Sequence, residues 1–178
     1  CFRDGDHAWV AVRSDPESPL TVLRTSDGGR TWRSTTLAAS GMGEQFSFAD
    51  SEHGWMMVHL GVAAGSEGVA ILKTADGGQS WTEVTTALST NSGPGRLPFG
   101  GSKTGCTFRD ETTGWVTGFA PVDGKAYLYV TRDGGRTWQE QSLPLPEELQ
   151  SAQLTTFPPR FFTAQDGDRK STRLNSSH

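Results

Sequence analysis

One eight-residue pattern, T-x-D-G-G-x-[ST]-W, occurs three times and constrains the fold more than any other feature of this chain. The copies run from Thr25 to Trp32, from Thr74 to Trp81 and from Thr131 to Trp138. Successive copies begin 49 and 57 residues apart. Self-similarity at such a spacing is typical of repeat architectures, in which each repeat is one supersecondary unit.

A second pattern, F-x-D-x-x-x-[GA]-W, lies upstream of each copy of the first. Its copies run from Phe2 to Trp9, from Phe48 to Trp55 and from Phe108 to Trp115. Together the two patterns contain all six tryptophans of the chain. Because the spacing is kept, we expect the tryptophans of each pattern to be largely buried at equivalent places.

The Asp-Gly-Gly of the first pattern has the chemistry of a β-hairpin turn. An aspartate carboxylate can accept hydrogen bonds from nearby backbone amides, and glycine permits positive φ angles. The tryptophan then opens the return strand. We expect these positions to be structural rather than catalytic: Asp27, Gly28, Gly29, Trp32, Asp76, Gly77, Gly78, Trp81, Asp133, Gly134, Gly135 and Trp138.

Apolar runs before and after these turns predict a four-stranded antiparallel unit in each repeat. In the second repeat we expect strands over 44–49, 54–60, 68–74 and 80–85. A unit this small cannot bury both faces alone, whereas stacking of units around an axis buries them. The predicted fold is all-β: a partial β-propeller with blades over about 1–36, 44–86 and 105–143, and the start of a fourth over 158–167. Three blades do not close a ring, so we expect the native protein to continue beyond this fragment.

The first pattern resembles the Asp-box, also called the bacterial neuraminidase repeat (BNR). The second resembles the repeat of photosystem II assembly-factor-like and related exported bacterial propellers. The resemblance covers about residues 1–167 and implies a periplasmic, extracellular or envelope-anchored location. It is more specific for fold than for function, since Asp-boxes also occur in sialidases, xyloglucanases and sortilin-type receptors.

The last eleven residues, DRKSTRLNSSH over 168–178, depart from the repeat. The alignment predicts a tryptophan at position 168, where the chain has Asp168, and no apolar strand follows. The segment resembles a translated sequencing-adapter read-through. We therefore treat it as a non-native tail and leave it out of functional reasoning.

Composition excludes several classes of protein. The net charge is −4 and the charges are scattered, so a basic stripe for nucleic acid has no support. No apolar run approaches the roughly 20 residues that span a bilayer. The two cysteines are too far apart for a metal motif. We expect neither a metal nor another cofactor.

A catalytic site is not evident either. A sialidase would need a tyrosine nucleophile, a glutamate partner and three converging arginines, but Tyr127 and Tyr129 lie in a predicted outer strand. Arg3 and Arg109 share a repeat column, which favours a structural role. Glycosidases also need two facing carboxylates, and nothing in the sequence pairs them. We assign no catalytic residue.

The segment from Asn91 to Gly105 is the most unusual loop, and long loops on a rigid scaffold commonly carry function. We expect it to expose Leu97 and Phe99 and to bind through Arg96, Phe99 and Lys103. A disordered insertion is the alternative. The favoured function is a non-catalytic scaffold that binds a protein or envelope component, as an assembly factor would. The alternatives are a fragment of a sialidase-like or other glycoside hydrolase, with a carbohydrate ligand, and a sensor or adhesin ectodomain.

Overall fold

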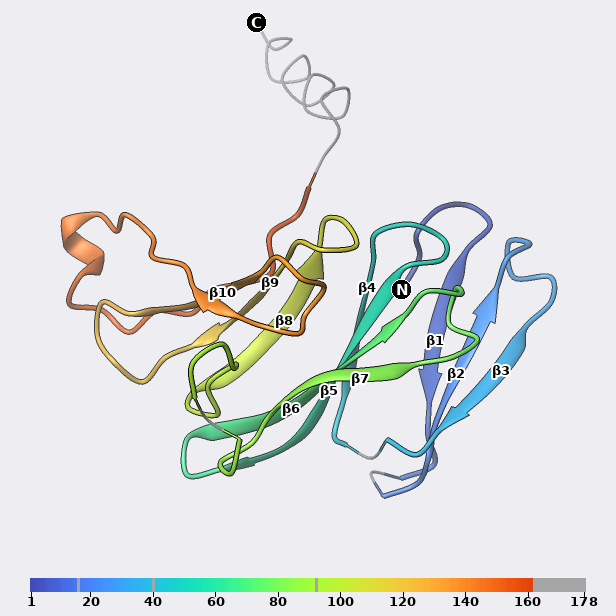
Figure 1. Cartoon of the computed structure of the whole chain (residues 1–178), viewed down its shortest axis with the longest axis horizontal. Coiled ribbons are helices and arrows are strands. Elements are labelled where there is room, and N and C mark those ends of the chain that lie inside the picture. The colour runs from blue at the N-terminus through green and yellow to red at the C-terminus, as the bar shows by residue number, and fades with distance from the viewer. Residues whose placement is uncertain (16, 40, 92, 162–178) are drawn as a thin grey trace, which may run out of the picture.

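Three antiparallel sheets follow one another along the chain in a computed structural model that describes residues 1–15, 17–39, 41–91 and 93–161 (Figure 1). In each sheet the strands are neighbours in chain order. The first sheet contains β1 (Ala8–Val12), β2 (Leu20–Thr25) and β3 (Arg33–Leu37). The second contains β4 (Glu44–Phe48), β5 (Gly54–Ala63), β6 (Ser66–Thr74) and β7 (Thr82–Ala87). The third contains β8 (Ser102–Phe108), β9 (Gly114–Phe119), β10 (Ala126–Thr131) and β11 (Gln139–Glu140).

The prediction of an all-β partial propeller is confirmed, with two differences in detail. The first sheet has three strands, and the place of its first strand is marked by an isolated bridge between Phe2 and Ala8. The hairpin of the second sheet is longer than expected, because β5 and β6 pair as far as Ala63 and Ser66. Ala64 and Gly65 both have positive φ, as a two-residue hairpin turn requires.

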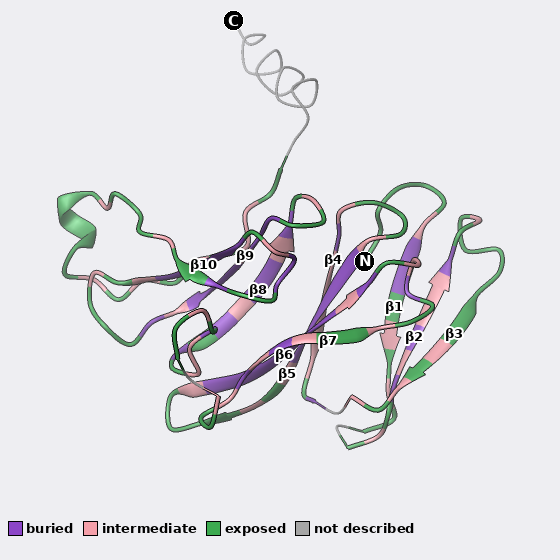
Figure 2. Cartoon of the chain, viewed as in Figure 1, coloured by how far each residue is buried: buried purple, intermediate pink, exposed green. Residues whose placement is uncertain are grey.

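The second sheet is buried on both faces, because successive side chains of a strand point to opposite faces and those at the start of β5 are all apolar. On β5, Trp55 and Met57 pack with the third sheet, while Met56 and Val58 pack with the first. Figure 2 shows the resulting concentration of buried residues in the middle of the three packed sheets. Each sheet therefore depends on its neighbours for its core, as expected of stacked repeats.

The Asp-box turns have the predicted chemistry. The carboxylate of Asp133 accepts hydrogen bonds from the Thr137 amide (2.8 Å), the Thr137 hydroxyl (2.6 Å) and the Thr131 hydroxyl (2.8 Å). Gly134 and Gly135 follow with φ of 74° and 96°. Asp27 and Asp76 make the equivalent bonds.

Aromatic rings and turn carbonyls join the sheets in the same way at both interfaces. Trp9 stacks on Phe48 at 3.5 Å between ring centroids, and its indole N–H donates to the carbonyl of Gly77 (2.8 Å). Trp55 stacks on Phe108 at 3.9 Å and donates to the carbonyl of Gly134 (2.9 Å). The Asp-boxes of the second and third sheets thus also receive the tryptophan of the preceding sheet.

The expectation that all six tryptophans are equivalently buried is wrong. Trp9, Trp55 and Trp138 are buried, Trp81 and Trp115 are half-buried, and Trp32 is 42% exposed. The reason is positional: Trp81 and Trp138 meet the edges of Phe48 and Phe108 at the two interfaces, on the side of each sheet that faces the preceding one. Trp32 belongs to the first described sheet, so no preceding sheet among the described residues covers it.

Beyond β11 the chain forms a short 3₁₀ helix (Glu147–Leu149) and returns to the third sheet. There Thr155 bridges Phe119, and the Thr156 amide donates to the carbonyl of Gly118 (2.8 Å). The fourth blade expected over 158–167 is described only as far as Phe161, without a strand, and the tail over 168–178 lies outside the described residues. No helix in the described part of the chain has the length and apolar character needed to cross a bilayer.

Candidate functional site

The segment predicted to bind a ligand instead packs between the second and third sheets. Leu97, predicted to be exposed, is fully buried in the shared core, because the connection between the sheets folds back into the gap between them. The Trp138 amide donates to the carbonyl of Gly95 (3.0 Å), and the Tyr127 hydroxyl donates to the carbonyl of Pro98 (2.9 Å). The described part of the segment is therefore an ordered connection and not a disordered insertion.

Lys103 anchors this segment from within. It is 5% exposed, and its ammonium donates to the carbonyls of Phe99 (2.7 Å), Glu67 (2.8 Å) and Gly101 (3.1 Å). Burial lowers the pKa of Lys103 to about 8, and the charge of Glu67 opposes that shift. The Glu67 carboxylate accepts the Lys103 amide (2.6 Å) and pairs with His59 Nδ1 (2.8 Å).

The three residues predicted to bind therefore do not share one free surface. Arg96 is exposed, Phe99 is half-buried, and Lys103 is enclosed by backbone carbonyls. Burial of Lys103 follows from contacts with Glu67, a residue distant in sequence, so no local signal indicated it. Arg96 stays a binding candidate.

The residues considered for catalysis are held within the fold. Tyr127 is 3% exposed, and burial, with the nearby Tyr129 and Glu67, raises the pKa of its hydroxyl. The ring of Tyr129 lies beside it, 4.8 Å away between centroids. The Asp-box carboxylates are occupied by turn hydrogen bonds. Those from Thr31 and Thr25 hold the pKa of Asp27 at about 2.

One group of side chains in the described residues has the spacing of a metal site: Asp50, His53 and Glu111 lie within 4.8 Å of one another. His53 Nδ1 lies 2.9 Å from Asp50, and His53 Nε2 lies 3.5 Å from Glu111. Asp50 and Glu111 are exposed, and His53 is half-buried. These contacts connect a turn of the second sheet to a turn of the third. This structural role is enough to explain why the three side chains lie together.

A broad depression lies where the first strands of the repeats approach one another. Its volume is about 790 Å³, and its lining includes Phe46, Phe161, Arg3, Arg109 and Arg160. The three arginines are exposed. We call this the axial depression.

Cross-strand bonds fix the floor of the axial depression. The Cys106 amide donates to Gln45 Oε1 (2.8 Å), and the Phe108 amide donates to Ser47 Oγ (2.8 Å), so β4 and β8 are held side by side. Arg109 lies 6.0 Å from the centroid of the Trp115 ring and pairs with Asp110 (2.9 Å). Sequence reasoning missed the site because it treated Arg3 and Arg109, in one repeat column, as structural. The shared column was itself the available signal.

Comparison with known proteins found one matching repeat family and a similar solved structure. The family model described as BNR/Asp-box repeat matches residues 129–140, which include the whole third copy of the first pattern. A solved structure described as "YCF48 bound to D1 peptide" is similar at 25% sequence identity and a TM-score of 0.45. The alignment covers 76% of this chain and 36% of that chain, so the present chain spans well under half of that protein's length. No curated protein sequence matched the chain.

Proposed function

We propose that this chain, which carries BNR/Asp-box repeats on three sheets of a β-propeller, is part of a non-catalytic scaffold that binds a protein or an envelope component. The axial depression is the observation that supports the proposal most. It gathers exposed arginines and phenylalanine rings from separate repeats onto a rigid floor. Arginine and aromatic residues are enriched among the hot spots of protein interfaces.

The chemistry of the axial depression favours a protein segment that combines carboxylates with apolar side chains. Arginine pairs with carboxylates through two parallel hydrogen bonds, and its planar group also stacks on aromatic rings. Arg3 and Arg160 reach this surface from opposite ends of the described chain. The extent of the depression, about 790 Å³, suits an extended segment better than a single side chain.

The test is selection from a displayed random-peptide library on the purified chain, followed by measurement of affinity for the enriched peptides. We expect enrichment of peptides with Asp or Glu beside apolar residues. Arg109→Glu should weaken them at least tenfold. The matched control is Arg33→Glu, the same charge change on outer strand β3, which should leave affinity unchanged. Equal effects of the two substitutions, or no enrichment, would contradict the proposal.

A glycoside hydrolase is the competing function, and the place of the tyrosines argues against it. The nucleophile of such an enzyme would be a tyrosine hydroxyl. The hydroxyl of Tyr127 is buried and donates a hydrogen bond to the carbonyl of Pro98. The discriminating assay is release of a fluorogenic group from sialoside and β-glucan substrates. Turnover above a heat-treated control that Tyr127→Phe or Tyr129→Phe abolishes would favour the hydrolase.

A further inference from the structure

The two interfaces between sheets are built alike at the Asp-box turns and differ at the opposite end. Between the second and third sheets, Gly95–Phe99 enters the gap and places Leu97 in the core. Between the first and second sheets, the chain crosses from β3 to β4 within residues 38–43. No described residue of that shorter connection places a side chain in the core between these sheets.

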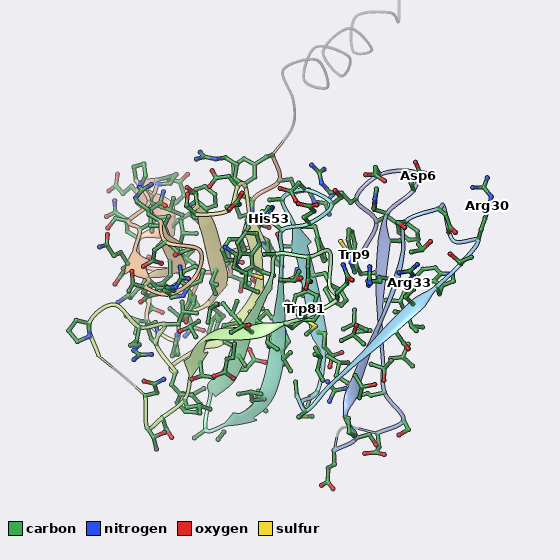
Figure 3. All side chains as sticks on the ribbon, turned by 45° about the vertical axis from the view of Figure 1, so that its right-hand side comes forward. Asp6, Trp9, Arg30, Arg33, His53 and Trp81 are labelled. Carbon is green, nitrogen blue, oxygen red and sulfur yellow. The ribbon has the colours of Figure 1, made fainter. Side chains whose placement is uncertain are left out.

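Between these sheets lies a groove of about 390 Å³, which we call the inter-sheet groove. The side chains that line it are apolar except for one carboxylate, and they include Leu37, Ala38, Leu60, Ala70, Trp81 and Glu83. Its volume falls within the roughly 300–1,000 Å³ of ligand pockets. Figure 3 shows Trp81, with Trp9, between the ribbons of the first and second sheets.

The repeat itself indicates what such a groove accepts. A constant offset of 57 residues relates Trp81 to Trp138, Ala70 to Tyr127 and Glu83 to Glu140. In the third sheet the Tyr127 ring and Leu97 together fill the core at this place. In the second sheet position 70 is an alanine, and no described residue of 38–43 takes the place of Leu97 in the core.

Trp81 also lacks the bond that fixes its counterparts. The indole N–H groups of Trp32 and Trp138 donate to the carbonyls of Gly29 (3.1 Å) and Gly135 (2.9 Å). The Trp81 Nε1 atom is buried without a hydrogen-bond partner among the described residues. Leaving a buried donor unpaired is unfavourable. Binding of a ligand would therefore be favoured if it let the ring turn so that this N–H found an acceptor.

We propose that the inter-sheet groove binds an extended segment of a partner protein that carries a leucine-like residue preceded by a basic residue and followed by proline. This is the chemistry of the chain's own Arg96-Leu97-Pro98 at the other interface. Glu83 is exposed at the groove and supplies the charge that the basic residue would meet. The inference rests on the proposed binding function and adds a second site, distinct from the axial depression, with a defined class of partner segment.

The probe is a synthetic peptide with the sequence of residues 93–100, GPGRLPFG, blocked at both ends and titrated into the full chain. The signals are tryptophan fluorescence and amide chemical shifts of β3, β6 and β7. We expect saturable binding, and at least tenfold weaker binding of the same peptide with Asp in place of Leu.

Two variants place the peptide in the groove. Ala70→Tyr installs the ring that the third sheet has at this position and should abolish binding. Glu83→Lys reverses the charge of an exposed residue and should weaken binding at least fivefold, so the test survives if Ala70→Tyr fails to fold. The control is Val62→Tyr at the exposed tip of the β5–β6 hairpin, which should bind as the parent chain does.

The outcomes separate this inference from the proposed function. Absence of saturable binding, or binding that Ala70→Tyr and Glu83→Lys both leave intact, would overturn the groove. Concentration-dependent dimers that the peptide dissociates would show that a second copy of the chain is the occupant, which also overturns the inference. Library peptides that still depend on Arg109 would leave the proposed function standing in each case.

Discussion

Tryptophans that occupy the same place in the repeat differ in their surroundings, and this difference should be measurable. Trp138 is 2% exposed and Trp32 is 42% exposed, although both follow an identical Asp-Gly-Gly turn. We expect Trp138→Ala to lower the free energy of unfolding by about 3–5 kcal/mol, as removal of a core aromatic does. Trp32→Ala should cost about 1 kcal/mol or less. Urea unfolding of both variants is the measurement, and equal losses would contradict the packing described above.

The Asp-box carboxylates should make stability depend on pH in the acid range. Burial alone would raise the pKa of Asp76, but hydrogen bonds from Ser80, Thr74 and Gln79 hold it at about 2, below its ordinary value of 3.8. A pKa lowered in the folded state contributes stability that is present above pH 4 and is lost as pH falls toward 2.

Asp76→Asn removes the titrating group, so the variant should lose less stability than the parent chain between pH 4 and pH 2. Melting temperatures measured across that range test this expectation. Asp123→Asn, in the exposed loop between β9 and β10, is the control and should follow the parent chain. An Asp76→Asn profile parallel to that of the parent would show that the turn bonds do not favour the ionised form.

At the scale of elements, the connection between the second and third sheets depends on one close backbone approach. Gly101 has φ of 75°, and a Cβ atom there would overlap the carbonyl oxygen of Phe119. The same residue accepts a hydrogen bond from the Glu67 amide (3.0 Å) and forms a parallel bridge with Ser66. The connection is therefore held by backbone contacts that no side chain can replace.

Gly101→Ala should destabilise the chain by more than about 1 kcal/mol, because an alanine at positive φ against a carbonyl is strained. The adjacent Gly100 is the matched control: a Cβ atom there has no neighbour within 4 Å. Gly100→Ala should change stability by no more than about 0.5 kcal/mol. Chemical denaturation of the pair is the measurement, and a neutral Gly101→Ala would mean that the connection can move away from Phe119.

At the scale of the whole molecule, the three sheets should behave as a row of units coupled through neighbours. Phe48 couples the first two sheets through Trp9, and Phe108 couples the last two through Trp55. Phe48→Ala should therefore deprotect amides of β1–β3 in hydrogen exchange more than those of β8–β11. Phe108→Ala should show the reverse order. Uniform loss of protection in both variants would instead indicate a single cooperative unit.

Most of the fold could be predicted from the sequence because its signals are local. The turn at Asp133 needs only Thr131, the two glycines and Thr137, all within four positions of it. The strands expected over 44–49 and 68–74 are found at Glu44–Phe48 and Ser66–Thr74, because the apolar pattern of a strand is also a local signal. The strand over 68–74 contains the continuous apolar run 69–72, which is typical of a strand covered on both faces.

The tertiary structure alone decided burial and surface, since both depend on which sheet lies opposite a residue. Trp32 and Trp138 share a motif, yet only Trp138 faces another described sheet. Leu97 and Lys103 belong to a segment whose composition is typical of an exposed loop, but contacts with the core and with Glu67 bury them. The axial depression brings Arg3 and Arg109 together across about a hundred residues of chain. A sequence determines local turns directly, whereas a surface assembled from distant repeats exists only once the sheets have packed.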